Sequence, residues 1–527
     1  MCILCDQGKP QNHSRSQLGR RDFLKVSSAA AAGATGMGLF ATPPARANHE
    51  EDLPHDTGRL GRRYVIRGGH VMSMDPAVGY FVEGDVLVEG KKIVAVGQNL
   101  DVRGAARIDA RGRIVMPGFI DTHHHQFETA LRSFLADGLL FNDGDPSGHG
   151  AINYFQYILG KFAGFYRPED VYISELFGSL SQLDAGVTTS HDISQIHYTP
   201  EHSDAAIKGS AASGRRIVFG YFEGARADLQ GSPPGASYPE DARRIRKQYF
   251  SSSDQLMTMF MGGEIYLQPP GFYTTTWNLG RELGIPIAAH IVGSFGMAPE
   301  FEAIATGQRA VAFGPDNLFI HMTGMTDPAW QAVKDAGAGV SLAVPIEMNM
   351  RHGTPPIIKT LQIGIQPSLS VDVEVTLTAD MFTQMRSAMT LQRMFENARA
   401  LGEGYAAGFP KLPLLTSRDV LRFATIEGAK DLKLDHKVGT LTPGKEADII
   451  ILDAEAINVH PLNVVPGAVV SLMERSNVLT VIVAGKIRKW ESKLLDVNLR
   501  KLRLDLENSR NSLFDAAGID QDLFRPN

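Results

Sequence analysis

The sequence predicts an α/β protein. A (β/α)₈ barrel of the TIM type is combined with a discontinuous β-sandwich, which is built from both ends of the mature chain, that is, the chain without its first 47 residues. Between about residues 119 and 430, eight short apolar runs alternate with helical stretches, a pattern typical of parallel strands buried on both faces. Strand-like segments flank this region on both sides. At 527 residues, the chain has room for one large and one small domain.

The first 47 residues are predicted to be a removable segment outside the fold. The stretch GRRDFLKVSSAAAAGATGMGLFATPPARAN has paired arginines, Arg20 and Arg21, then a weakly apolar run and an A-x-A site at Ala45–Ala47. It resembles a twin-arginine signal peptide, which implies a periplasmic or secreted mature protein. A transmembrane anchor is the alternative, but the run is short, rich in Gly and interrupted by two prolines.

Removing this segment changes two properties of the chain. It carries six Lys and Arg against two Asp and Glu, so the mature protein is more negative than the −6 of the whole chain, and we expect no nucleic-acid partner. Both cysteines, Cys2 and Cys5, lie in it, so an oxidising compartment suits the mature protein. We expect no membrane span in the mature protein.

The β-sandwich is predicted from residues 61–118 and 431–490. The first stretch contains RYVIRGGHVMSMD and DVLVEGKKIVAVGQ, and the second contains KVGTLTPGKEADIIILDA and NVLTVIVAGKIRKW. Runs rich in Val and Ile between Gly-rich turns are typical of strands. In the tail, 491–527, apolar residues recur near helical spacing among many charges, which predicts a helix packed on the surface of the body. A partner-binding helix is the alternative.

The barrel is predicted over residues 119–430. After RIVMPGF, its strands are VTTSHD, RIVFGYF, LMTMFM, PIAAH, LFIH, GVSLA and PSLSVD. In barrels of this type the chemistry lies at the carboxyl ends of the strands. Polar residues that end these runs are therefore the candidates for a functional site.

Three adjacent histidines follow the first run. Because successive side chains of a strand face opposite sides, His123 and His125 share one side and His124 takes the other. Three later runs also end in a possible ligand: His290, His321 and Asp372. Each of these residues alone would more often be structural, but their joint placement indicates a metal site. Imidazole and carboxylate suit zinc or ferrous iron, with one position left for water.

A family resemblance extends this interpretation. PGFIDTHHH resembles the PGxIDxHxH signature of the amidohydrolase superfamily, and FETALR resembles its cytosine deaminase and triazine hydrolase branch, which is chlorohydrolase-like. LDAGVTTSHD, GTLTPGKEADIIILD and NVLTVIVAGKIRKW resemble further elements, so the likeness spans nearly the whole mature chain. The resemblance implies a metal-dependent hydrolase that acts on a small molecule, and it favours a homo-oligomer.

The resemblance also implies roles for individual residues. The ligands of one divalent ion, Zn²⁺ first and Fe²⁺ as the alternative, are His123, His125, His290 and Asp372. Asp372 is also implied to be catalytic as the proton acceptor, and His321 to stabilise the attacking water or the developing oxyanion. Two-metal members usually carry a lysine at the end of the fourth strand, where LMTMFMGGEIYL has none; Glu264 is a conceivable bridge to a second ion.

One position departs from the branch. Its deaminases carry H-x-x-E at the fifth strand, the glutamate passing a proton to the substrate ring, but here the stretch is HIVGS and the position is Gly293. We therefore expect hydrolysis of a non-peptide carbon–nitrogen bond in a small, cyclic or aromatic substrate. One alternative is a heterocycle deaminase with another proton donor, such as Glu223 or Glu264. A non-catalytic barrel that binds a small molecule is the alternative of another class.

Other polar residues are weaker candidates for substrate binding, and several of them could equally orient a ligand from behind. These candidates are Gln126, His191, Asp192, Glu223 and Glu347. For His124 a packing role is favoured, and Arg132 is either close to the site or an ion-pair partner. Met, Phe and Tyr in the loops indicate an apolar or aromatic substrate, although ordinary packing explains them equally well.

Overall fold

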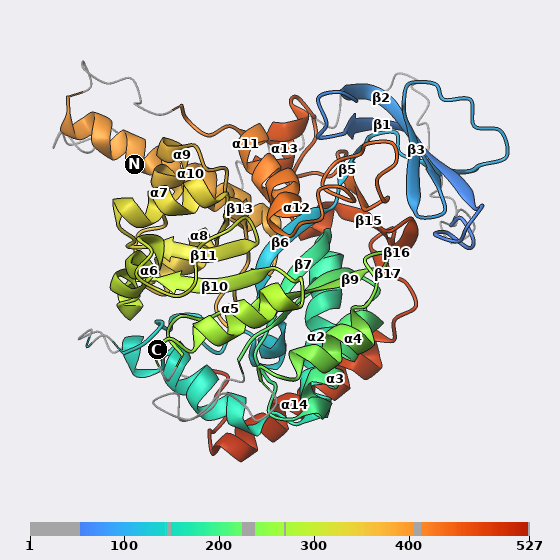
Figure 1. Ribbon diagram of the computed structural model, residues 1–527. Coiled ribbons are helices and arrows are strands. Elements are labelled where there is room, and N and C mark those ends of the chain that lie inside the picture. The colour runs from blue at the N-terminus through green and yellow to red at the C-terminus, as the bar shows by residue number, and fades with distance from the viewer. Residues whose placement is uncertain are drawn as a thin grey trace, which may run out of the picture. The chain divides into compact units, whose positions relative to one another are not determined.

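The computed structural model describes residues 53–142, 144, 149–223, 238–267, 270–404 and 413–524. The predicted signal peptide, residues 1–47, lies outside the described residues. Within them the chain forms a barrel and a separate sheet (Figure 1). No helix in this described part is both long enough and apolar enough to cross a membrane.

The barrel is a sheet of eight parallel strands that pair in chain order. The strands are β6 (Phe119–His124), β7 (Val187–Ser194), β8 (Arg216–Tyr221), β9 (Met257–Gly262), β10 (Ile287–Val292), β11 (Asn317–Thr323), β12 (Gly339–Leu342) and β13 (Ser368–Leu369). Seven of these strands correspond to predicted apolar runs. The eighth run, RIVMPGF, mostly forms strand β5 (Arg113–Pro117) of the separate sheet, and β6 is the segment FIDTHH that follows it. The predicted fold class is confirmed. The strands read as continuous apolar runs because helices cover the sheet's outer face and side chains fill its interior.

The first and last strands meet and close the barrel just beyond β13. The backbone N–H of Asp372 donates to the carbonyl of His123 over 2.8 Å, and the N–H of His125 donates to the carbonyl of Asp372 over 2.9 Å. Two predicted site segments therefore form the seam at which the barrel closes.

Helices follow the strands around the barrel. They are α2 (Pro168–Asp184), α3 (Pro200–Ala212), α4 (Ala242–Tyr249), α5 (Tyr273–Glu282), α6 (Ala298–Ala305), α7 (Asp327–Ala336), α8 (Val344–Asn349), α9 (Ile357–Ile363), α10 (Met381–Gly402), α11 (Ser417–Arg422) and α12 (Gly428–Asp431). Proline in the first turn of several of them, including α2 and α3, fits a position whose N–H has no partner within the helix. The connection from β6 to α2 contains the short helical segments η1 (Gln126–Leu131) and η3 (Tyr154–Phe162).

The separate sheet has nine strands from both ends of the described chain. The N-terminal strands are β1 (Arg63–Met72), β2 (Tyr80–Glu89), β3 (Lys92–Gly97), β4 (Ala106–Asp109) and β5 (Arg113–Pro117). The C-terminal strands are β14 (Ile449–Asp453), β15 (Val478–Val483), β16 (Lys486–Trp490) and β17 (Lys493–Leu494). Antiparallel pairing of β5 with β14 joins the two sets. Apolar side chains from both sets, including Ile66, Val86, Ile449 and Ile482, form one core.

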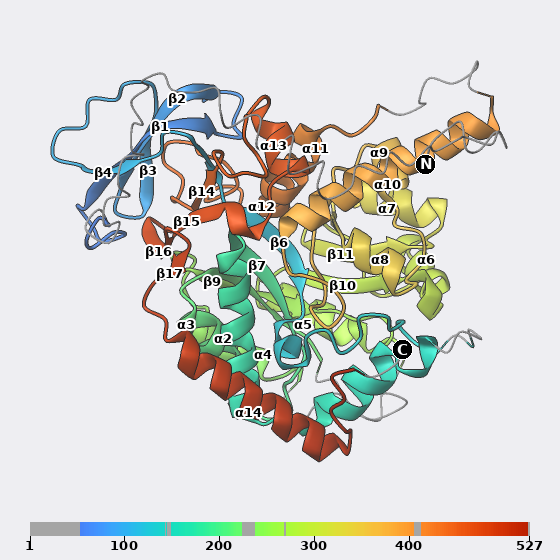
Figure 2. The same ribbon diagram turned by 180° about the vertical axis from the view of Figure 1, so that it is seen from behind.

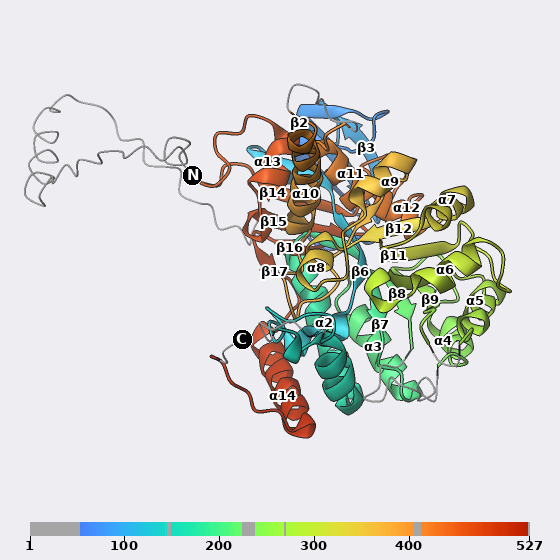
Figure 3. The ribbon, with the colours of Figure 1, turned by 90° about the vertical axis from the view of Figure 1, so that its left-hand side faces the viewer.

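The C-terminal tail forms helix α14 (Leu499–Ala517). Figure 2 and Figure 3 show it running alongside α2. It buries Leu513 and Phe514, and the ring of Phe514 lies 5.0 Å from that of Phe162 and 5.6 Å from that of Phe134. Phe134 and Phe162 both belong to the β6-to-α2 connection, so α14 supports the segment that follows the predicted ligands of β6.

Candidate metal centre

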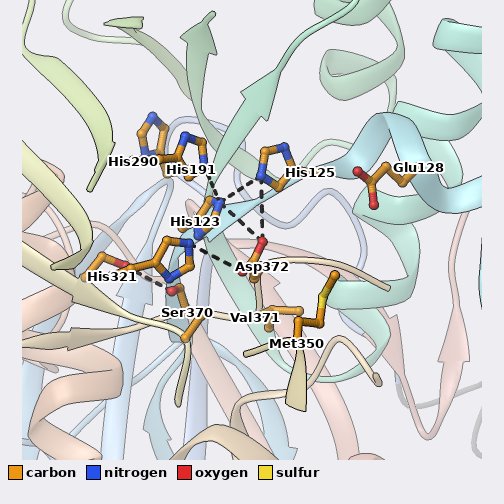
Figure 4. A network of polar contacts seen from close by, with 12 residues as sticks. His123, His125, Glu128, His191, His290, His321, Met350, Ser370, Val371 and Asp372 are labelled. Atoms are coloured by element: carbon orange, nitrogen blue, oxygen red, sulfur yellow. Dashed lines mark hydrogen bonds and ion pairs between the residues drawn. The ribbon is translucent and has the colours of Figure 1, made fainter. Parts of the chain in front are cut away.

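Side chains from four strand ends converge at the mouth of the barrel (Figure 4). The Nε2 atom of His123 lies 2.9 Å from that of His125 and 3.0 Å from that of His290. The Asp372 carboxyl closes the group, with Oδ1 3.5 Å from His123 Nε2 and 3.7 Å from His125 Nε2. On its other side, Oδ2 lies 3.5 Å from His321 Nε2. We call these five residues the mouth cluster.

The spacing of these atoms suits a bound metal ion. Two groups, His123–His125–His290 and His123–His321–Asp372, each bring their ligand atoms within 4.8 Å of one another. Ligands that each lie about 2 Å from one ion are themselves roughly 3 Å apart. The mouth cluster therefore fits a divalent ion such as zinc.

Burial keeps three of the four imidazoles of the mouth cluster available as ligands. It lowers the pKa values of His123, His125 and His321 well below 6.5, so these rings are neutral at pH 7 and carry a lone pair. Burial also raises the pKa of Asp372 to about 7. An ion with two positive charges would reverse that effect and hold the carboxyl ionised.

Two carboxylates orient histidines of the mouth cluster from behind. Glu264 accepts from Nδ1 of His290 over 2.6 Å and from the His290 backbone N–H. Glu347 lies 3.1 Å from Nδ1 of His321 and accepts from the N–H of Ala343 over 2.9 Å. A carboxylate at Nδ1 fixes the tautomer whose Nε2 lone pair points into the mouth cluster. Glu347, predicted as a substrate contact, thus lies behind His321, and Glu264 lies behind His290.

The aspartate of the PGFIDTHHH motif ties the two sides of the barrel seam together. Asp121 is buried, and its Oδ1 accepts from the N–H of His123 over 3.2 Å and from the N–H of Val371 over 3.0 Å. Gln182 donates to its Oδ2 over 2.5 Å. Asp121 therefore connects the segment that carries His123 to the segment that carries Asp372.

Two residues of the mouth cluster have a strained backbone. His321 has a φ of 72° and Asp372 a φ of 70°, in the left-handed region that non-glycine residues rarely adopt. Such conformations persist where the surroundings impose them, and they are often found at functional sites.

The middle histidine of the triplet lies apart from the mouth cluster. His124 is buried, and its Nε2 is 3.8 Å from Oε2 of Glu374. The same carboxylate pairs with Arg132 over 2.6 Å. Arg132 is thus an ion-pair partner, one of the two roles considered for it.

A pocket lies above the mouth cluster. In the described part of the chain, three of the predicted substrate contacts are not among the residues that line it. Gln126 is held by the hydroxyl of Ser179 over 2.8 Å and by Arg215 over 2.5 Å, which directs its amide away from the mouth. His191 is buried with Nδ1 3.1 Å from the carbonyl of Thr122, and Asp192 is fully buried. That these three residues touch substrate stays a prediction.

Glu223, also predicted as a substrate contact, lies behind two residues that line the pocket. Tyr266 donates to it over 2.5 Å and Gln195 over 3.1 Å, and both of these donors line the pocket. Burial, together with the neighbouring Glu264 carboxyl, raises the pKa of Glu223 to about 7. A second tyrosine–carboxyl pair, Tyr154 to Glu128 at 2.5 Å, is built in the same way.

The pocket above the mouth cluster has mainly apolar and aromatic walls. Its lining is His125, Leu140, Tyr154, Phe155, Leu159, Gln195, Tyr266, His290, Val292, Phe295, Met297, His321, Met350, His352, Asp372 and Val373. The ring of Phe295 lies 4.5 Å from that of Phe155 and is nearly parallel to that of Tyr266 at 6.0 Å. Such walls suit a flat, weakly polar ligand.

Sequence reasoning missed four polar residues of this lining: Tyr154, Gln195, Tyr266 and His352. Gln195 directly follows β7. The other three lie in connections, where no periodicity indicates which way a side chain points.

Comparisons with known proteins identify the family of this chain. The model of the amidohydrolase family matches residues 114–488. The 5'-deoxyadenosine deaminase of Methanosarcina mazei is 25% identical over 463 residues, covering 85% of this chain and 98% of that protein. The 5-methylthioadenosine/S-adenosylhomocysteine deaminase of Pelotomaculum thermopropionicum is 24% identical, covering 84% and 97%.

Two solved structures share the fold. A zinc-bound adenosine deaminase from Xanthomonas campestris superimposes with a TM-score of 0.71 at 20% identity, covering 87% of this chain and all of that one. A zinc complex of atrazine chlorohydrolase from Arthrobacter aurescens superimposes with a TM-score of 0.69 at 19% identity, covering 85% and 100%.

Proposed function

The chain belongs to the amidohydrolase family, and on this premise we propose that it is a metal-dependent hydrolase of a non-peptide carbon–nitrogen bond in a small, cyclic or aromatic substrate. The observation that carries the proposal is the convergence of His123, His125, His290 and Asp372 beneath an aromatic pocket. The convergence favours catalysis over the non-catalytic barrel, because a binding protein would not need these residues.

We propose one divalent ion, held by these four residues, with zinc as the metal. Neutral imidazoles and one carboxylate are typical zinc ligands, and solved structures with the same fold contain zinc. Beyond β9 the chain offers Glu264, whose carboxylate is committed to His290, and this favours one ion over two. When bound, such an ion lowers the pKa of a water ligand towards neutrality and polarises the substrate.

The roles proposed for the protein's own side chains follow from their positions. Asp372 accepts the proton of the attacking water and passes it to the leaving group, since this residue lines the pocket and its Oδ2 lies 3.5 Å from Nε2 of His321. His321, whose Nε2 carries a lone pair in the tautomer that Glu347 fixes, accepts a hydrogen bond from the attacking water and so stabilises it. Glu347 holds His321 in the tautomer that this role requires.

A deaminase reaction is the second candidate, and one structural observation favours it. Glu223 is a buried carboxyl whose pKa is raised to about 7, and the hydroxyl of Tyr266 connects it to the pocket. A carboxyl with this pKa is suited to proton transfer at neutral pH. The relatives that carry deaminase names are consistent with this candidate.

One experiment tests the proposal and separates the two candidates. The protein starting at residue 48 is purified, its metal content is measured, and it is screened against cyclic amides, aromatic amines and carbamates. We expect about one zinc per chain and turnover of at least one class, with ammonia released only if the deaminase candidate is correct. A zinc-free protein that binds but turns over none of them would refute the proposal.

We also propose that residues 1–47 direct export and that the mature protein is periplasmic or secreted, because of the paired arginines and the A-x-A site. A fusion of these residues to a reporter should be exported, and replacing Arg20 and Arg21 by lysine should stop it. We propose a homo-oligomer for the mature protein, which light scattering after size exclusion would test.

A further inference from the structure

The position that deaminases of the resembled branch fill with glutamate is closed by backbone in this protein. A Cβ placed on Gly293 would lie 2.6 Å from the carbonyl oxygen of Thr323 and 2.9 Å from Cα of Gly324. Those backbone atoms belong to the end of β11 and the turn after it, which cannot yield as a flexible side chain would. No carboxylate can extend into the pocket from residue 293 while β11 keeps this path.

Thr323 connects this closed position to a histidine. Its hydroxyl accepts from the N–H of Gly293 over 3.2 Å and donates to the carbonyl of His352 over 2.8 Å. The next residue, Gly353, has a φ of 129°, and a Cβ there would meet Thr323 Cβ at 3.1 Å. The backbone at His352 is therefore held close to the position where the glutamate would begin.

The side chain of His352 lines the pocket and is 4% exposed. Its ring stands perpendicular to that of His321, with 4.7 Å between the ring centroids. Neither of its ring nitrogens makes a hydrogen bond to another described residue. Buried polar groups normally have partners, because an unsatisfied one destabilises the fold. A polar ligand in the pocket would supply the partner.

We propose that His352 is a specificity-determining residue that hydrogen-bonds the ring edge of a flat nitrogen heterocycle in the pocket. This inference rests on the proposed function and narrows its substrate class. A neutral imidazole has one donor and one acceptor nitrogen, which complements a ring nitrogen, a ring N–H or a ring carbonyl. The aromatic rings of Phe155, Tyr266 and Phe295 in the pocket wall suit the faces of such a ring.

Two matched compounds test the proposal directly. 4-Aminoquinazoline and 1-naphthylamine have the same fused skeleton and the same amine, and they differ by two ring nitrogens. Binding of each to the zinc-loaded protein is measured by titration calorimetry. We expect the unaltered protein to bind the quinazoline about tenfold more tightly, the size of effect that one buried hydrogen bond provides. His352→Phe should lose this preference, and His352→Gln, which keeps a donor and an acceptor, should retain most of it.

Controls separate recognition from general damage. Met348→Leu changes an exposed side chain of the neighbouring helix α8 and should leave the preference unchanged, and all variants should hold the same amount of zinc. If His352→Phe does not fold, His352→Met replaces it, since methionine adapts to irregular space. The proposal is overturned if the unaltered protein shows no preference, or if the apolar variant keeps it.

The hydrolysis screen distinguishes failure of this inference from failure of the proposed function. Loss of the preference in His352→Phe without any turnover by the unaltered protein would refute the hydrolase and leave the recognition role standing. Turnover of heterocycles by His352→Phe with unchanged KM and kcat would refute the recognition role alone.

Discussion

The mouth cluster and the ionic joint between barrel and sheet are both buried and polar, yet they are paired differently. At the joint, Arg216 at the start of β8 donates to Asp448 over 2.9 and 3.0 Å and to Glu446 over 2.8 Å. At the mouth, Asp372 is surrounded by imidazoles, which burial keeps neutral. The joint contains its own cation, whereas the mouth cluster presents lone pairs that a metal cation would satisfy.

The partner of the buried carboxylate distinguishes a structural cluster from a functional one. A buried carboxylate needs a positive partner. Where the partner is a guanidinium of the same chain, the cluster holds two parts of the fold together. Where the partners are neutral ligands at strand ends, the cluster is suited to bind an ion. A variant of the mouth cluster should therefore change turnover or zinc binding, and a variant of the joint should change stability.

The largest effect is expected at the mouth. Asp372→Asn keeps the size of the side chain but removes the proton acceptor, and turnover should fall by about three orders of magnitude. Steady-state kinetics on whichever substrate the screen identifies measures this. The melting temperature of the zinc-loaded variant should stay within a few degrees of the original. Near-normal turnover would show that Asp372 does not accept the proton.

The opposite result is expected at the joint. Arg216→Met removes the cation and leaves two buried carboxylates unpaired, which should lower the free energy of unfolding by about 3–5 kcal/mol. Denaturant titration measures this change. Zinc content per folded chain should not change, because the joint is not part of the mouth cluster. Loss of zinc without loss of stability would contradict the division into two clusters.

A smaller effect is expected behind the ligands. Glu264→Gln weakens the hydrogen bond that orients His290, and zinc affinity should fall by about 10- to 100-fold. Competition with a chelator measures this affinity. Glu347→Gln is the matched control, since Glu347 orients His321, which we assign to catalysis rather than to metal binding. It should lower turnover more than zinc affinity, and equal losses of zinc in both variants would make His321 a ligand as well.

The smallest effect concerns a buried carboxyl that belongs to neither cluster. Burial raises the pKa of Asp431, at the end of α12, to about 7, above the value near 3.9 of an unfolded chain. Between these two pKa values the folded protein holds a proton on Asp431 that the unfolded chain releases. The stability that the protonated Asp431 contributes is therefore present at low pH and is lost as the pH rises through about 7.

As the pH rises from 5 to 7, ionisation of Asp431 should lower the free energy of unfolding by about 1–2 kcal/mol. In Asp431→Asn this part of the pH dependence should disappear, as denaturant titrations at several pH values would show. Zinc content should match that of the original protein at every pH. An unchanged slope would mean that Asp431 is ionised in the folded protein.

The barrel and the convergence at its mouth were predictable because both depend on strand ends. Apolar runs identify the strands, and parallel strands bring their carboxyl ends to one rim. Sequence reasoning therefore grouped His123, His290 and Asp372, and the structure places their ligand atoms close together. The resemblance to a known family added the roles of individual residues.

The pocket could not be predicted in the same way. His352 and Tyr266 lie in connections, where the path of the backbone rather than a periodic pattern decides which side chains face inward. Gln126 begins η1 directly after His125, so strand alternation does not indicate which way its side chain points. The meaning of Gly293 also needed coordinates, since only they show that the backbone of Thr323 occupies the space beside it.

The barrel seam has a consequence for how the protein is made. Asp121 bonds the N–H of Val371, 250 residues further along the chain, so neither side of the seam is complete until most of the barrel has been synthesised. Contacts of such separation form late, because a long loop must be closed first. A nascent or truncated chain that ends before Val371 would therefore hold zinc only weakly through its histidines, and full loading of the metal would report that folding is finished.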